Sequence, residues 1–192
     1  LTLRSMKQAK YTTECTGHFG LAAKYYCHFT SPIRRYPDLQ IHRIIKDVLR
    51  GRMNGTREEH YRSILPEVAR QSSERERKAD EAERETIKLK KVEYMSDRIG
   101  NVYTGVISSV TKWGMYVELP NTIEGLIHVA NMRDDHYNYD ESRYEMVGER
   151  TGKVYKLGQE VRVKVADTDR LMRTIDFVIA KERDEENGED EW

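Results

Sequence analysis

A change of sequence pattern at Gly100 constrains the fold more than any other feature of this chain. Residues 72–99 consist of strong helix formers with many Glu–Arg and Glu–Lys pairs four residues apart, so we expect a long helix there, capped by Ser72 or Ser73. After Gly100, short runs rich in β-branched residues alternate with turn residues, at positions 102–110, 114–119, 123–129, 159–165 and 174–179. Five such strands in so short a segment predict a small Greek-key barrel of the OB type.

Upstream of the long helix, two prolines make a stiff turn. Pro32 and Pro37 each fix φ at about −65° and push the preceding residue toward an extended conformation. Apolar residues then recur at helical spacing, which predicts an amphipathic helix over roughly 37–50 that ends before Gly51.

Two weaker patterns lie on either side of this helix. Residues 18–23 indicate a strand that leads into the turn. Thr56 and Glu59 form a capping-box pattern, which predicts a short helix up to about residue 64. Pro66 should interrupt the helical pattern there and begin another short turn of helix, because proline lacks the N–H group that a helix interior needs.

Arg34 and Arg35 lie between the two prolines, in the most basic part of the chain. Residues 1–50 carry nine Lys or Arg against three Asp or Glu, although the whole chain has 33 of each kind. The N-terminus of a helix offers unpaired N–H groups, and a guanidinium matches the oxygens of a phosphate. The pattern is therefore compatible with a phosphate site. It is also compatible with two solvated arginines, or with arginines paired to nearby carboxylates.

The string HFTSPIRRYPDLQIHR at residues 28–43 resembles the signature of the ribonuclease II and ribonuclease R family of hydrolytic 3′→5′ exoribonucleases. The strings GHFGLA at 17–22, SSERER at 72–77 and AERE at 82–85 extend the resemblance. Farther along, WGMYVEL at 113–119 and EGLIHV at 124–129 resemble the S1 RNA-binding domain. Together they imply an α+β fold, in which the mainly helical C-terminal portion of an RNB catalytic domain precedes a five-stranded OB-type (S1) β-barrel.

The resemblance also implies how the chain is divided. Residues 1–99 would belong to the RNB catalytic domain and residues 100–180 to the S1 RNA-binding domain. Residues 130–152 would form a long insertion between the third and fourth barrel strands. The acidic tail, residues 181–192, is expected to be disordered.

By this resemblance, Arg34 would contact the scissile or a neighbouring phosphate and stabilise the charge that develops on it. Arg35 would do the same, or would instead support Tyr36 and Asp38; the sequence leaves both roles open. Glu83 matches the position of a family glutamate that influences the terminal nucleotide. The alternative for Glu83 is an ordinary solvent-facing glutamate.

The family cleaves RNA with Mg²⁺, which closely spaced aspartates hold so that it can activate water. This sequence has no such cluster, since its only Asp pair, Asp134 and Asp135, lies in the insertion. Mg²⁺ is therefore expected only in the complete enzyme, with ligands outside this chain. We expect the 192 residues to bind single-stranded RNA without cleaving it, as part of a processive exoribonuclease that releases nucleoside 5′-monophosphates. The alternative is a non-catalytic S1-type RNA-binding module.

The S1 resemblance implies an RNA-binding surface on the barrel. The residues that it assigns to this surface are Lys112, Trp113, Tyr116, His128, Asp169 and Arg173. Alternation along the second strand supports this, since its apolar residues would face the core while Tyr116 points outward. Exposed aromatic rings stack on bases of any sequence, and Gly114 would let a base approach closely. The alternative for Trp113 and Tyr116 is core packing.

The histidines and cysteines have no metal-binding spacing. His18, His28 and His42 do not share a helix face, so we expect core or hydrogen-bonded histidines rather than a metal site. Cys15 and Cys27 are expected to be reduced, unpaired thiols of a cytoplasmic protein.

The sequence has no apolar run of the roughly 18 residues that a membrane span needs and no signal-peptide pattern. It begins with Leu1 rather than Met, which is typical of a piece of a longer protein. We expect a monomer whose helical part packs against the rest of the RNB catalytic domain.

Overall fold

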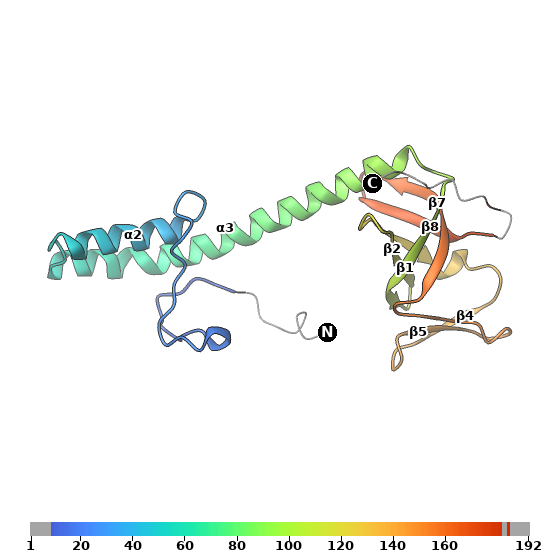
Figure 1. The fold of residues 1–192 in the computed structure, drawn as a ribbon, viewed down its shortest axis with the longest axis horizontal. Coiled ribbons are helices and arrows are strands. Elements are labelled where there is room, and N and C mark those ends of the chain that lie inside the picture. The colour runs from blue at the N-terminus through green and yellow to red at the C-terminus, as the bar shows by residue number, and fades with distance from the viewer. Residues whose placement is uncertain (1–8, 182–183, 185–192) are drawn as a thin grey trace. The chain divides into compact units, whose positions relative to one another are not determined.

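The computed structural model describes residues 9–181 and Asp184 (Figure 1). The fold has the predicted α+β class, with helices in its first compact unit and a barrel in its second. The two units separate between Ala82 and Glu83, inside the long helix α3 (Gly55–Ser96). The predicted acidic tail, residues 181–192, lies almost entirely outside the described residues.

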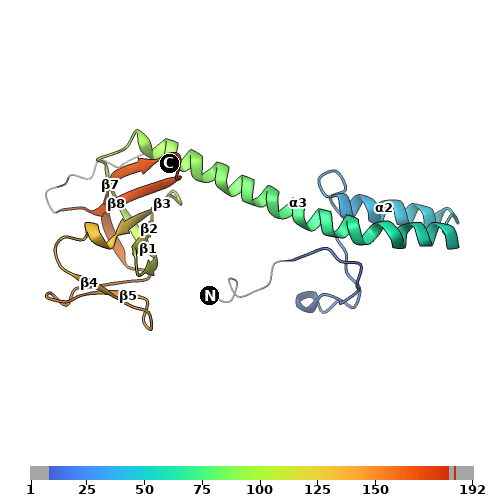
Figure 2. The same ribbon diagram turned by 180° about the vertical axis from the view of Figure 1, so that it is seen from behind.

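The first unit is built on a hairpin of two helices, α2 (Tyr36–Leu49) and the first part of α3 (Figures 1 and 2). Gly51 has a φ of 64°, the left-handed conformation that commonly ends a helix. Asp47 of α2 is buried and accepts hydrogen bonds from Arg57 Nε at 2.9 Å and Tyr61 Oη at 2.7 Å. A buried carboxylate with two donors thus joins the helices.

Several predictions for this unit were wrong. Residues 18–23 contain the short 3₁₀ helix η1 (Phe19–Leu21) instead of a strand, because Ala22 has a φ of 50° and turns the chain back on itself. Pro66 does not interrupt α3. An interior proline costs a helix about 3 kcal/mol, but strong helix formers lie on both sides, and Tyr61 anchors the segment before it to α2. The long helix also does not begin at Ser72 or Ser73, since α3 is continuous from Gly55 and the Ser73 hydroxyl donates to the Ala69 carbonyl inside it. Nor does Thr56 cap the helix start, where Asn54 Oδ1 accepts the N–H of Arg57 at 2.9 Å.

The second unit contains the predicted five-stranded barrel. Its strands are β1 (Val102–Thr111), β2 (Gly114–Glu118), β3 (Glu124–His128), β7 (Glu160–Asp169) and β8 (Thr174–Ile179). They close in the order β1-β2-β3-β8-β7, with β3 and β8 parallel and the other pairs antiparallel. The barrel core consists of completely buried side chains such as Met115, Val117, Ile127, Val163 and Phe177.

The predicted insertion between β3 and β7 has secondary structure of its own. It begins with the 3₁₀ helix η2 (Val129–Asn131). A three-stranded sheet follows, with strands β4 (Tyr137–Asp140), β5 (Glu145–Gly148) and β6 (Val154–Lys156). Met146 and Tyr155, which lie opposite each other on β5 and β6, are buried.

The end of α3 packs into the barrel. Met95 is completely buried and Val92 nearly so, and both belong to the same apolar cluster as the barrel core. Lys91 Nζ donates hydrogen bonds to the carbonyl and hydroxyl oxygens of Thr122, in the turn between β2 and β3. The last turns of α3 are therefore part of the second unit, although the change of sequence pattern lies at Gly100.

Candidate nucleic-acid interface

The turn before α2 is held by one buried carboxylate. Oδ2 of Asp38 accepts the backbone N–H of Ser31 and Nη2 of Arg35, each at 2.8 Å. Asp38 is completely buried, and the Arg35 side chain is 18% exposed. Burial by itself would raise the pKa of Asp38, but the Ser31 N–H and the Arg35 guanidinium outweigh this and lower it. Asp38 is therefore held in its charged form, paired with the Arg35 guanidinium.

The pair uses only part of its hydrogen-bonding capacity. Nε of Arg35 and Oδ1 of Asp38 are buried without a hydrogen-bond partner among the described residues. Arg35 also closes the turn through its backbone, since its N–H donates to the carbonyl of Ser31 at 2.9 Å. Arg35 is thus engaged on both its backbone and its side chain.

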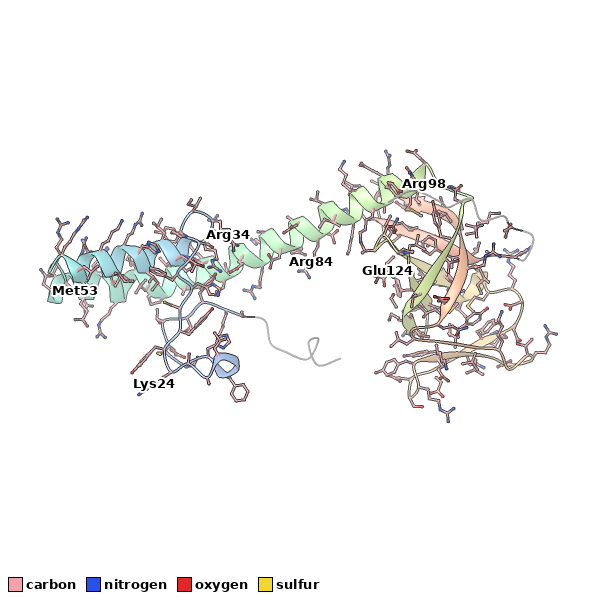
Figure 3. All side chains as sticks on the ribbon, in the orientation of Figure 1. Lys24, Arg34, Met53, Arg84, Arg98 and Glu124 are labelled. Atoms are coloured by element: carbon pink, nitrogen blue, oxygen red, sulfur yellow. The ribbon has the colours of Figure 1, made fainter. Side chains whose placement is uncertain are left out.

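Arg34 has a different environment from its neighbour. Its side chain is exposed, and no ion pair to it occurs within residues 9–181 and Asp184. Figure 3 labels Arg34 where the turn meets the helix hairpin. It lines a groove of about 880 Å³ between the turn and α3. The other charged residues of this groove are Arg35, Glu67, Arg75, Glu76 and Asp80. The groove therefore presents cations beside carboxylates rather than a uniformly basic surface.

Tyr11 also lines this groove, and no sequence pattern indicated it. Its backbone N–H donates to Ser73 Oγ of α3 at 2.9 Å, and its hydroxyl is hydrogen-bonded to Nδ1 of His28 at 3.1 Å. Burial, together with Glu76, raises the pKa of Tyr11 to about 12. Only the fold brings these residues together, because Tyr11 belongs to no helix or strand that would produce a periodic signal.

Glu83 is exposed on α3 and does not line the groove, whose last residue on that helix is Asp80. The structure thus places one of the three predicted catalytic residues, Arg34, with an exposed side chain in the groove. It places Arg35 at the groove wall and pairs it with Asp38.

The outer face of β2 and β3 carries the predicted aromatic surface. Trp113 is 60% exposed, and Tyr116 is half-buried on the outward side of β2. His128 lies opposite Gly114 on β3, and its Nδ1 accepts the N–H of Ala130 at 3.1 Å. The ammonium of Lys112 lies 4.8 Å from the centre of the Trp113 ring. An exposed ring, a cation and a histidine thus share one end of the β2–β3 pair.

Gly114 lies close against the backbone of β3. A side chain here would meet the carbonyl oxygen of Ile127 at 2.0 Å, and its φ of 145° suits glycine. The glycine allows the backbone of β3 to approach β2 closely. The structure therefore accounts for this glycine by strand packing, and the close approach of a base stays a prediction.

Asp169 and Arg173 lie at the other end of the β2–β3 pair. Leu126 pairs with Asp176 in the parallel β3–β8 ladder, so the start of β8 is level with Glu124. Four residues of strand, roughly 13 Å, separate Glu124 from His128. Asp169 Oδ1 accepts the N–H groups of Leu171 and Met172 at 2.8 and 2.9 Å and so closes the β7–β8 turn.

Asp134, Asp135 and His42, which the sequence did not assign to a metal site, make local hydrogen bonds. Within the described part of the chain, no group of three His, Cys, Asp or Glu side chains could hold a metal ion. Asp135 Oδ2 accepts both the N–H and the hydroxyl of Thr151 at 2.6 Å, and Asp134 Oδ2 accepts the Tyr137 hydroxyl at 3.0 Å. His42 Nε2 donates to the carbonyl of Phe29 at 2.9 Å.

Comparison with known families agrees with the division seen in the structure. The RNB domain matches residues 1–51, and the S1 RNA binding domain matches residues 96–179. Among the described residues, no helix is long and apolar enough to cross a membrane.

Similar proteins are named as ribonucleases. Ribonuclease R 1 of Lactococcus lactis is 48% identical over 92% of this chain and 22% of its own length. Ribonuclease R of Thermotoga maritima is 46% identical over 96% of this chain and 26% of its own length. The chain therefore spans about a quarter of the length of these relatives.

Solved structures of Mycoplasma genitalium RNase R are also similar. The apo form and a complex with ribose methylated single-stranded RNA each have a TM-score of 0.83 and 28% sequence identity to this chain. Each comparison covers 93% of this chain and 28% of the solved one.

Proposed function

This chain belongs to the ribonuclease R family, and on that premise we propose that it is part of a hydrolytic, processive 3′→5′ exoribonuclease that degrades RNA to nucleoside 5′-monophosphates. The proposal rests mainly on the different surroundings of two adjacent arginines. Arg35 holds the turn through Asp38, whereas Arg34 is exposed on that fixed turn and lines a groove.

Arg34 is proposed to contact a phosphate of the RNA at the site of cleavage. A guanidinium forms paired hydrogen bonds to phosphate oxygens and stabilises negative charge that develops on them. The turn fixes the backbone of Arg34 before RNA binds, so little ordering is needed. Glu83 is proposed to act near the terminal nucleotide, as its position in the family pattern suggests.

Mg²⁺ is proposed to act in the complete enzyme only. The acidic residues in the described part of this chain do not form a metal site, so they do not fit a bound Mg²⁺ ion. The ligands would therefore come from the rest of the protein, and the 192 residues would bind RNA without hydrolysing it.

The barrel is proposed to bind single-stranded RNA. Trp113 and Tyr116 would stack on bases, while Lys112, His128 and Arg173 would contact the backbone. Asp169 would keep the turn that carries Arg173 in place, which its two hydrogen bonds support. The complex described for Mycoplasma genitalium RNase R contains single-stranded RNA, which supports the same ligand here.

The first unit is proposed to pack against the rest of the RNB catalytic domain in a monomeric, cytoplasmic protein. Phe19 and Ile33 are fully exposed in this chain, and Leu21, Tyr25 and Leu49 are largely exposed. Apolar side chains gain free energy when a neighbouring surface covers them.

The test compares the 192 residues with the complete protein, using a fluorescent single-stranded oligoribonucleotide and Mg²⁺. The complete protein should release nucleoside 5′-monophosphates, and the 192 residues should bind the RNA and leave it intact. Mononucleotide release by the 192 residues would overturn the proposed division. Binding without any release by the complete protein would instead favour the non-catalytic RNA-binding module, which the lack of a carboxylate cluster among the described residues also fits.

A further inference from the structure

Near its C-terminal end, α3 contacts the β2–β3 and β7–β8 turns of the barrel through charged side chains. Lys91 binds the β2–β3 turn at Thr122. Glu85 of α3 forms an ion pair with Arg173, which ends the β7–β8 turn. Lys90 lowers the pKa of Glu93, and the nearby charge of Arg170 in the same turn adds to this effect. Two glutamates of α3, Glu85 and Glu93, therefore lie near the two arginines of the β7–β8 turn.

The Glu85–Arg173 pair is accessible to solvent and to ligands. The Arg173 side chain is 43% exposed and that of Glu85 is 34% exposed. Glu85 has a second cation, since Lys88 Nζ lies 3.0 Å from its Oε1. Lys88 and Arg173 together hold the pKa of Glu85 below its ordinary value. Glu85 would therefore keep a cationic partner if Arg173 moved away.

Arg173 lies at the end of a turn whose backbone is fixed by hydrogen bonds. Asp169 fixes the preceding N–H groups, and Arg173 itself has a φ of 55°. Its backbone is thus held in place, and the side chain is the part that can turn from one anionic partner to another. A carboxylate and a phosphate use the same donors of a guanidinium.

We propose that Glu85 pairs with the guanidinium of Arg173 in the RNA-free protein, and that the same guanidinium binds an RNA phosphate in the complex. RNA must therefore displace Glu85 before Arg173 can contact it. The inference rests on the proposed binding of RNA by the barrel. It makes Glu85 a residue that lowers RNA affinity rather than one that contributes to it. Exposed ion pairs are weak, so a phosphate can displace the carboxylate without a large loss of affinity.

The experiment is a double-mutant cycle in the 192-residue chain, with a fluorescent oligouridylate as the probe at low salt. The variants are Glu85→Gln, Arg173→Gln and the double variant. Glu81→Gln is the matched control, because it removes the same charge one turn earlier on α3, and the described residues give Glu81 no ion pair. Thermal unfolding of each variant checks that the fold is kept.

Glu85→Gln should bind the probe roughly two- to fivefold more tightly, as expected for the release of one exposed ion pair. Glu81→Gln should bind like the parent chain, and Glu85→Gln should have no effect when Arg173 is already replaced. Unchanged or weaker binding by Glu85→Gln would overturn the inference and leave RNA binding by the barrel intact. An equal gain with and without Arg173 would overturn it too, because the effect would then be one of net charge. Absence of binding by the parent chain would instead refute the proposed function.

Discussion

Nη2 of Arg35 lies 2.8 Å from Oδ2 of Asp38, three residues later in the chain, and this carboxylate is completely buried. The pair closes the turn that leads into α2, together with the Ser31 N–H. It also removes Arg35 from the surface while Arg34, the adjacent residue, stays exposed in the groove. Two arginines that look alike in the sequence thus have different surroundings in the fold.

Replacing Asp38 should destabilise the first unit. Asp38→Ala leaves the Arg35 guanidinium and the Ser31 N–H without their acceptor, which we expect to cost about 2–4 kcal/mol of unfolding free energy. Asp38→Asn keeps an acceptor for the N–H but not the charge, so its loss should be smaller. Urea unfolding of the chain measures both, and equal stability of all three proteins would contradict the account of the turn.

Replacing Arg34 should affect catalysis, whereas replacing Arg35 should affect the stability of the fold. In the complete protein, Arg34→Ala should lower kcat by about 100- to 1,000-fold and change RNA affinity much less, if Arg34 stabilises charge in the transition state. Arg35→Ala should instead lower the unfolding temperature. A loss of affinity in Arg34→Ala with unchanged kcat would make Arg34 a binding residue only.

The aromatic and basic residues of the barrel should respond differently to salt. Trp113→Ala and Tyr116→Ala should each weaken RNA binding by roughly 5- to 150-fold and leave the slope of log affinity against log salt unchanged. Lys112→Ala should reduce that slope by about 0.7, because one phosphate contact with a single strand is lost. Fluorescence titrations at several salt concentrations measure both quantities. Unchanged affinity in the two aromatic variants would place RNA elsewhere.

The helix hairpin should weaken in acid through Asp47. The Tyr61 hydroxyl, followed by Arg57, lowers the pKa of Asp47 in the folded protein. A depressed folded-state pKa adds stability above the unfolded pKa of about 4, and this stability is lost as the pH falls through the folded value. The stability difference between the parent chain and Asp47→Asn should therefore shrink from pH 6 toward pH 3. A difference that does not depend on pH would contradict the charged pairing.

Met95 tests whether the end of α3 belongs to the barrel. Met95→Ala should cost about 2–5 kcal/mol, because it opens a cavity in a closed apolar core. Ile99→Ala is the control, since Ile99 is 49% exposed and its loss should cost much less. Urea unfolding followed by the barrel signal compares the two. Equal effects would mean that the helix end is not part of the core.

Local patterns in the sequence predicted much of the fold. The bounds of β8 agree with the prediction, and β1, β2, β3 and α2 differ by only one or two residues at their ends. Burial alternates along β2 as expected, with Tyr116 outward and Val117 inward. Such signals succeed because side-chain direction repeats every two residues in a strand and turns interrupt the repeat. The three-stranded sheet of the insertion was missed, since its strands of three or four residues are too short to establish a pattern.

The sequence by itself determined the helix before the barrel, the five barrel strands and the residue types available for RNA. Tertiary structure alone decided that Arg35 forms an ion pair with Asp38, that Tyr11 donates a hydrogen bond to Ser73, and that Glu85 forms an ion pair with Arg173. Backbone periodicity is a local property that neighbouring residues encode. The partner of a charged or polar side chain instead depends on which distant segments the folded chain brings within hydrogen-bond distance.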